Sequence, residues 1–495
     1  MSDVRPACRA RQGRHRGPRS DRRWGRTHPG LVLSGALVPL VLLGSGALVA
    51  LQQAGGEATP ATAPVAATSS RLRQPAPRDV PAPLTAHLPV IRDAALAADL
   101  PARVGAEYAG GAVGRTATAS GVSTADIHAV LARRTSALRA RNEKAFLATF
   151  DPSRPQLVAT ERTLFRNLVK LPLVNPSYLE SGITGSATSR RSYVSLIHQL
   201  RGVDAEPTEL SKVEQWTRRG SAVVTTTVSP VPGAPASRYA PLDQVPLAVV
   251  NGRQVTVAGT GDVKNLTQIA ATAERAATAV RQLWGTRSGP SRFVLFVTHD
   301  KRAVGTWFGS SDAPFTASGA TLLQVSVRHL TKYAGARVIV DLNQTSMTEL
   351  LRVLRHEFTH AEDVQAQSVP AASVAQNYPT WAEEGFAAWV EELDLPLDRS
   401  LYASVVKTLR TTWNRRLPPA DRAGFYVDGE RGAYNYGTAA LVYRYIATRW
   451  GTAKAVAFYA AMAGGHSSAA YTLLGTDQAG FTSTWATWVD GLLAA

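Results

Sequence analysis

The feature that most constrains this chain is the string HEFTH, which runs from His356 to His360. It lies in a stretch without Pro or Gly, and Ser346 and Glu349 near its start have capping-box spacing, so a helix is predicted. Four residues make a little over one helical turn, so both imidazoles project from one face and can reach a single zinc ion. The alternative is a helix that merely carries two surface histidines.

A second predicted helix, TWAEEGFAAWVE, offers a third ligand. A catalytic zinc ion normally takes three protein ligands and leaves a fourth position for water. Thr380 and Glu383 again have capping-box spacing, which gives Glu383 a local role at the helix N-terminus. Glu384 is then left as the ligand, and Gly385 beside it allows another helix to approach closely. The alternative is that both glutamates only favour the helix dipole.

Together the two motifs, HEFTH and EEGFAAWVE, resemble those of the gluzincin metallopeptidases. The likeness is to the aminopeptidase N branch and the wider peptidase MA-like group, whose second motif runs roughly N-E-G-F-A-x-Y-V-E. The resemblance implies that Glu384 is the zinc ligand, in agreement with the capping argument. Between His360 and Glu384 lie 23 residues, some more than is usual in the aminopeptidase branch.

A third segment supports the same resemblance. The stretch from Tyr436 to Gly451 is similar to the family's Y-x-x-G-x-x-x-L-x-x-L helix, which ends in Gly, although Ala439 replaces the usual internal Gly. The resemblance implies that Tyr436 donates a hydrogen bond to the developing oxyanion. Tyr434 is the alternative donor, and either residue could simply be a packed aromatic.

The expected mechanism follows from zinc chemistry. Zinc held by the three ligands would lower the pKa of its bound water to about 7. Glu357 would take that proton during attack on the substrate carbonyl and pass it to the leaving amine. Three acidic residues lie one or two turns from the ligands, and one of them is expected to orient a histidine: Glu349, Asp363 and Glu391.

The sequence constrains the identity of the substrate less than it constrains the type of reaction. The G-x-M-E-N sequence by which the aminopeptidase branch recognises a free N-terminus is absent upstream of His356, so endopeptidase and exopeptidase action both stay open. The resemblance implies that the edge strand before the zinc helix, expected at 336–342, binds extended substrate by β-addition. The sequence thus predicts a zinc-dependent peptidase acting on peptides or proteins. The alternative is a binding or sensing ectodomain with a vestigial or structural zinc site.

The N-terminal part predicts a membrane anchor. Residues 1–29 contain nine Arg and two Asp, whereas the 22 residues of 30–51 carry no charge and are long enough to span a bilayer. We expect an uncleaved, single-pass anchor in the cell membrane, with the Arg-rich tail in the cytoplasm and the rest of the chain outside. A cleaved signal peptide is the alternative. The Pro-rich and Ala-rich residues 52–86 are expected to be an extended linker.

The charge and cysteine content agree with this placement. The net charge of +17 could suggest nucleic-acid binding, but orientation of a membrane helix explains the Arg-rich tail equally well, and no aromatic platform accompanies the other charges. Nucleic acid is therefore not an expected partner. The single cysteine, Cys8, lies in the predicted tail, so no disulfide can form within the part expected outside the membrane. The oligomeric state stays open.

The rest of the chain predicts an α+β protein. Residues 87–229 show helical periodicity and then strands, an order that resembles the NTF2-like or SnoaL-like α+β fold, which either binds a ligand or is purely architectural. A Pro-rich linker follows at 230–248. Residues 246–495 hold a helix, a small sheet and the zinc helices, the order expected of a gluzincin catalytic domain, with an all-α subdomain over 400–495. Its strand candidates are 292–297, 321–327 and 336–342.

Overall fold

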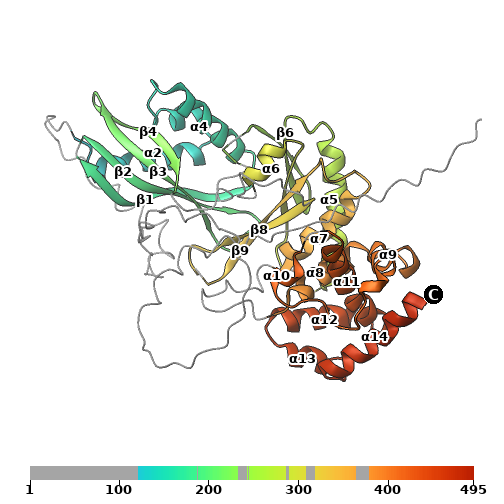
Figure 1. The fold of residues 1–495 in the computed structure, drawn as a ribbon. Coiled ribbons are helices and arrows are strands. Elements are labelled where there is room, and N and C mark those ends of the chain that lie inside the picture. The colour runs from blue at the N-terminus through green and yellow to red at the C-terminus, as the bar shows by residue number, and fades with distance from the viewer. Residues whose placement is uncertain are drawn as a thin grey trace, which may run out of the picture. The chain divides into compact units, whose positions relative to one another are not determined.

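The computed structural model describes residues 121–494, except 187, 232–241, 244, 286–288, 308–317, 330, 364–377 and 428. The predicted tail, anchor and linker, residues 1–86, lie outside the described residues, as does the start of the predicted NTF2-like region. Among the helices that are described, none is long and apolar enough to cross a membrane. Helices and two separate sheets make the described part an α+β fold (Figure 1).

The first sheet follows a group of three helices, in the order that the sequence predicts. The helices are α2 (Thr124–Arg139), α3 (Glu143–Leu147) and α4 (Pro155–Leu168). The antiparallel sheet contains β1 (Leu173–Ser186), β2 (Ser189–Leu200), β3 (Thr208–Arg219) and β4 (Ala222–Pro230), paired in chain order. A tight hairpin turn joins β3 to β4, where Arg219 pairs with Ala222 and Gly220 has a positive φ of 60°.

The second sheet is mixed. Its strands are β5 (Leu247–Asn251), β6 (Val255–Thr260), β7 (Phe293–Thr298), β8 (Gly319–Val325) and β9 (Tyr333–Asp341). They are arranged β5-β6-β7-β9-β8, with the three central strands parallel and both outer strands antiparallel. Helix α5 (Leu266–Trp284) connects β6 to β7, and α6 (Lys301–Trp307) follows β7.

The predicted edge strand is wrong. Residues 336–341 belong to β9, which is buried along its whole length between β7 and β8. The edge is β8, which precedes β9 in the chain and folds back antiparallel to it. The strand nearest the zinc helix in sequence need not be the outermost strand in space, because the order of strands along the chain does not determine their order in the sheet.

The C-terminal part is helical. Helices α7 (Leu350–Glu362) and α8 (Thr380–Glu391) carry the two motifs, and α11 (Glu430–Trp450) carries the third. Helices α7, α8 and α11 pack side by side (Figure 1). The remaining helices are α9 (Leu401–Thr408), α10 (Arg422–Phe425), α12 (Thr452–Ala463), α13 (Ser467–Thr472) and α14 (Gln478–Ala494).

The second sheet separates two hydrophobic cores. Alternate residues of β7 point to opposite faces, as the period of a strand requires. Phe293, Leu295 and Val297 join a core built with α5, α7, α8 and α11. Val294 and Phe296 join a core built with the N-terminal helices and the first sheet. The sheet is therefore covered on both faces, and α7 is held against one of them.

Close packing of α8 on α11 depends on Gly385. A Cβ at this position would lie 2.6 Å from the Ala439 carbonyl oxygen and 2.8 Å from the Ala439 Cβ. Contacts this short are not sustained by real side chains, so only glycine permits this helix separation. The expectation that Gly385 allows close helix approach is confirmed.

We therefore expect Gly385→Ala to lower the free energy of unfolding by about 1–3 kcal/mol through overpacking. Gly491→Ala is the matched control on α14, because an added Cβ there meets no atom within 4 Å. The control should be neutral or slightly stabilising. Denaturant unfolding of the two variants checks this, and equal stability of Gly385→Ala and wild type would contradict it.

Candidate metal centre

Two imidazoles and one carboxylate meet between α7 and α8. Glu384 Oε2 lies 3.3 Å from His356 Nε2 and 3.9 Å from His360 Nε2, and one ligand atom from each residue lies within 4.8 Å of the others. The three residues are only 5 %, 2 % and 0 % exposed for His356, His360 and Glu384. The carboxylate thus points toward both rings, as the predicted ligand set requires.

The donor atoms fit a metal ion. Although His356 Nε2, His360 Nε2 and Glu384 Oε2 are buried, none has a hydrogen-bond partner within the described ranges. Buried polar atoms without partners are rare in proteins and require an explanation such as a bound ion. Four ligands placed tetrahedrally about 2.1 Å from one ion stand roughly 3.4 Å apart, close to the separations found here. These residues could therefore hold a metal ion.

The protonation states of Glu384 and His360 suit metal ligands. Burial opposes ionisation of Glu384, but His360, His356 and a tyrosine hydroxyl outweigh it and lower the pKa of this carboxyl to about 2. Burial lowers the pKa of His360, which keeps that ring neutral at pH 7. Burial also acts against the charged form of His356, yet Glu384 and Glu391 raise its pKa well above the usual value. Without a metal ion this ring is therefore protonated at pH 7, and a bound ion would take the place of the Nε2 proton.

The predicted pairing of Ser346 with Glu349 is present ahead of α7, but it does not cap the helix itself. The Ser346 backbone N–H donates to Glu349 Oε2 at 3.1 Å, and the Glu349 N–H donates to Ser346 Oγ at 3.3 Å. These two bonds have the reciprocal pattern of a capping box, but the helix begins only at Leu350, and its N-cap residue, Glu349, makes no side-chain cap bond. His356 and His360 lie about one turn apart on α7, on the face turned toward Glu384 of α8.

The predicted cap of α8 is wrong. Thr380 is already the first helical residue, and Pro379 in the preceding position makes no side-chain cap bond. A capping box needs its first residue outside the helix, so Thr380 and Glu383 cannot form one. Glu383 is instead buried near His360. The elimination that selected Glu384 therefore rested on a wrong premise, although Glu384 is the residue that meets both rings.

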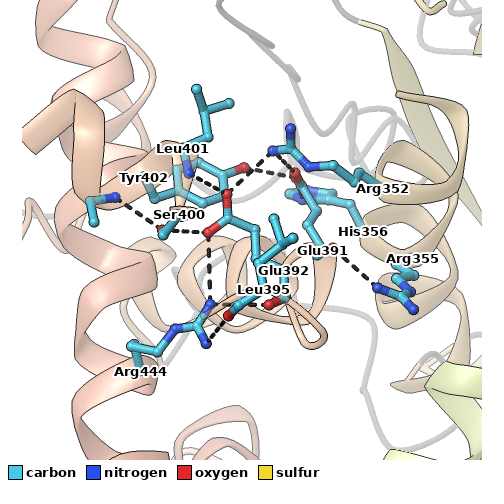
Figure 2. Close-up of polar contacts among 11 residues, drawn as sticks. Arg352, Arg355, His356, Glu391, Glu392, Leu395, Ser400, Leu401, Tyr402 and Arg444 are labelled. Carbon is cyan, nitrogen blue, oxygen red and sulfur yellow. Dashed lines mark hydrogen bonds and ion pairs between the residues drawn. The ribbon is translucent and has the colours of Figure 1, made fainter. Parts of the chain in front are cut away.

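Of the three acidic residues expected to orient a histidine, Glu391 does so (Figure 2). Its Oε1 lies 2.8 Å from His356 Nδ1 and accepts a hydrogen bond from the Tyr402 hydroxyl at 2.8 Å, while Arg352 donates to Oε2 at 3.2 Å. With Nδ1 held by a carboxylate, Nε2 of the ring faces Glu384. Glu349 and Asp363 have other partners, in Ser346 and Tyr459.

Glu357 lies beside the donor set and has its own partner. It is 2 % exposed, and Thr321 Oγ1 on β8 lies 2.8 Å from its Oε2. Burial raises the pKa of Glu357 to about 7, although the nearby charge of His356 opposes the shift. The close approach of β8 depends on Gly319, because a Cβ there would lie 3.0 Å from Glu357 Cγ. Glu357 can thus gain or lose a proton near neutral pH.

The structure distinguishes the two candidate tyrosines. The Tyr436 ring centroid is 6.4 Å from that of His356, and its buried hydroxyl has no partner among the described residues. Burial together with the charge of Glu384 raises the pKa of Tyr436 well above its usual value. Burial raises the pKa of Tyr434 to about 12, and the group beside its hydroxyl is the backbone of Asn414. Only Tyr436 is therefore placed beside the donor set.

Sequence reasoning missed two polar partners of the site. The Tyr426 hydroxyl donates to Glu384 Oε1 at 2.6 Å, and Thr321 donates to Glu357. Tyr426 lies next to α10 in a stretch without a motif, so no signal indicated it. Thr321 opens a predicted strand, but the sequence did not indicate that this strand lies beside α7.

Comparison with protein-family models and with curated proteins gave no match for this chain.

We expect Glu391→Gln to weaken zinc binding by about 10–100-fold, because the amide loses the charge that holds His356 Nδ1. Glu392→Gln is the matched control. Its carboxylate is more buried than that of Glu391 and accepts hydrogen bonds from the Ser400 hydroxyl and the Leu401 N–H instead of contacting a ring (Figure 2). Competition with a chromophoric chelator measures both affinities. An equal loss in both variants would contradict an orienting role for Glu391.

Proposed function

We propose that this chain is a zinc-dependent peptidase of the gluzincin type. The observation that carries the proposal is the position of Glu357, a buried carboxylate beside a set of two imidazoles and one carboxylate. Three protein ligands leave one position open for water, as in catalytic sites, and a purely structural site has no need of a carboxylate between its histidines. The sequence likeness of both motifs to gluzincins supports the same assignment.

Zinc is the metal that the donor set favours. Two neutral imidazoles with one carboxylate are typical of catalytic zinc sites in peptidases. When bound, zinc supplies a nucleophilic water near neutral pH and polarises a carbonyl. His356 and His360 from α7 and Glu384 from α8 would hold it, and the Tyr426 hydroxyl fixes the second oxygen of Glu384.

Glu357 serves as the general base and then as the general acid. A pKa of about 7 lets this carboxyl accept a proton from water and release it to the leaving amine without a large energy cost in either direction. The Thr321 hydroxyl, 2.8 Å from Oε2, holds this carboxyl in place. Tyr436, whose hydroxyl has no partner within the described part of the chain, would donate to the developing oxyanion.

An extended peptide binds along β8. This strand is the sheet edge beside α7, and no strand of the described ranges pairs with its outer side. Thr321 faces Glu357, and Leu323 and Val325 on the same face are partly exposed. Backbone groups of β8 can pair with a substrate strand and present its peptide bonds to the site. Because β8 carries no acidic residue to bind an amino terminus, this edge favours cleavage within a chain.

We also propose that the catalytic part acts outside the cytoplasm. The uncharged segment 30–51 would anchor the chain in the cell membrane, and the Arg-rich residues 1–29 would remain in the cytoplasm. A peptidase held in this way meets peptides or proteins near the outer membrane surface, with residues 52–86 as the spacer.

A second candidate is a binding or sensing ectodomain whose metal site is structural. The near-complete burial of all three ligands favours it, because structural sites are closed to solvent. Glu357 argues against it, since a buried carboxyl with no ligand role lowers stability.

The peptidase proposal predicts that Glu357→Gln keeps zinc but loses turnover. The amide cannot accept a proton, and loss of general base catalysis costs roughly 10²–10⁴-fold in rate. Metal analysis of wild type and variant, together with cleavage of a mixed peptide library, provides the test. Equal cleavage by both proteins, or cleavage by neither, would favour the binding or sensing alternative. The cleavage positions would also separate endopeptidase from exopeptidase action.

The tyrosines give an independent test. Tyr436→Phe should lower kcat by about 10²–10³-fold with little change in KM, because it removes a donor that acts only in the transition state. Tyr434→Phe is the matched control on the same helix and should retain most activity. Steady-state kinetics on one cleaved peptide would measure both variants, and the reverse ranking would transfer the role to Tyr434.

A further inference from the structure

A second buried polar contact lies behind the other histidine. His360 Nδ1 and Glu383 Oε2 are both buried and have no hydrogen-bond partner in the part of the chain that is described. The other oxygen of Glu383, Oε1, lies 3.7 Å from His360 Nδ1. Both residues are about 2 % exposed, so water cannot readily satisfy either group. An N–H donor and a carboxylate acceptor thus face each other in a place that is largely shielded from solvent.

The helix N-terminus alone does not explain the burial of Glu383, an acidic residue in the first turn of α8. It makes no capping box with Thr380, since α8 starts at that residue. A buried carboxylate costs several kcal/mol unless it is paired, so Glu383 needs a partner to be tolerated. The imidazole of His360 is a basic group within ion-pair distance of Glu383, and Arg422 also acts on the charge of this carboxyl.

His356 shows how a carboxylate beside Nδ1 orients an imidazole ring. His356 Nδ1 lies 2.8 Å from Glu391, and its Nε2 faces Glu384. His360 has the same arrangement with a longer separation, since its Nε2 faces Glu384 and its Nδ1 faces Glu383. A single helix, α8, therefore supplies the shared ligand and an acidic neighbour for each ring.

We infer that Glu383 is a positioning residue, whose carboxylate accepts the Nδ1 proton of His360 and directs Nε2 toward the metal ion. A separation of 3.7 Å is longer than a hydrogen bond, and a small rotation of the ring toward a bound ion closes it. The inference rests on the zinc binding proposed above. It does not require that the chain be a peptidase.

The test uses two substitutions of Glu383 in the full chain. Glu383→Leu removes the acceptor, and Glu383→Gln keeps an oxygen that can accept the bond. We expect the Leu variant to weaken zinc binding by about 10–100-fold and the Gln variant to lose less. Zinc affinity is measured by competition with a chelator, and the visible absorption spectrum of the cobalt-substituted protein reports the ligand geometry. The cobalt bands should shift in Glu383→Leu.

Glu362→Gln is the matched control. This residue is a buried carboxylate on α7 that accepts a hydrogen bond from the Gly289 N–H at 2.7 Å and has no ion-pair contact with either ring among the described residues. It should bind zinc as wild type does. The metal-free Glu383→Leu protein should melt no lower than wild type, because the substitution removes a buried charge whose Oε2 has no partner within the described residues.

The outcomes distinguish a failure of the zinc-binding proposal from a failure of the role of Glu383. If wild type binds no zinc, the metal proposal itself fails. If wild type binds zinc and Glu383→Leu binds it equally well, with unchanged cobalt bands, the role of Glu383 is overturned. It is also overturned if Glu362→Gln loses as much affinity as Glu383→Leu, or if the metal-free Leu variant melts well below wild type, because either result indicates a general effect on folding.

Discussion

The packing of α8 against its neighbours is the contact on which the site depends. Glu384 reaches both imidazoles only because α8 lies close to α7, and the absence of a side chain at Gly385 lets its other side meet α11 near Ala439. A shift of α8 by about 1 Å would disturb every ligand distance at once, since the ligand and both acidic neighbours of the rings lie on this helix. The position of Glu384 relative to both rings therefore depends on glycine at 385.

The sheet has a different role, which is to place β8 beside the donor set. Its central strands are fully buried, with one face packed against α5 and α7 and the other against the N-terminal core. Asp204, near the first sheet, receives two hydrogen bonds from Arg337 on β9 at 2.6 and 2.9 Å, and this buried pair ties the N-terminal part to the strand that supports β8. The N-terminal helices and sheet thus contribute to holding the edge where Thr321 meets Glu357.

Local patterns predicted the parts of the site that lie within one helix. The spacing of His356 and His360 and the pairing of Ser346 with Glu349 before them follow from local geometry alone, and the structure contains both. The contacts of Thr321 and Tyr426, and the position of the sheet edge, depend on strand order and chain packing over long sequence distances. A one-residue difference in the start of α8 was enough to give Glu383 the wrong role, since helix ends are the least certain feature of a sequence prediction.

The charges around the rings argue for a divalent cation. Glu357, Glu383, Glu384 and Glu391 are all buried or nearly so, and among the described residues the cationic groups near them are Arg352, Arg422 and the histidines. Burial, together with the neighbouring carboxylates, raises the pKa of Glu357 and Glu383, and burial lowers the pKa of His360. Like charges crowded at low dielectric repel one another strongly, and a doubly charged ion between the ligands would offset that repulsion. The carboxylates of Glu383 and Glu391 lie behind the rings and would not contact the ion directly. Each can accept an imidazole N–H there while the positive charge of the ion still attracts it.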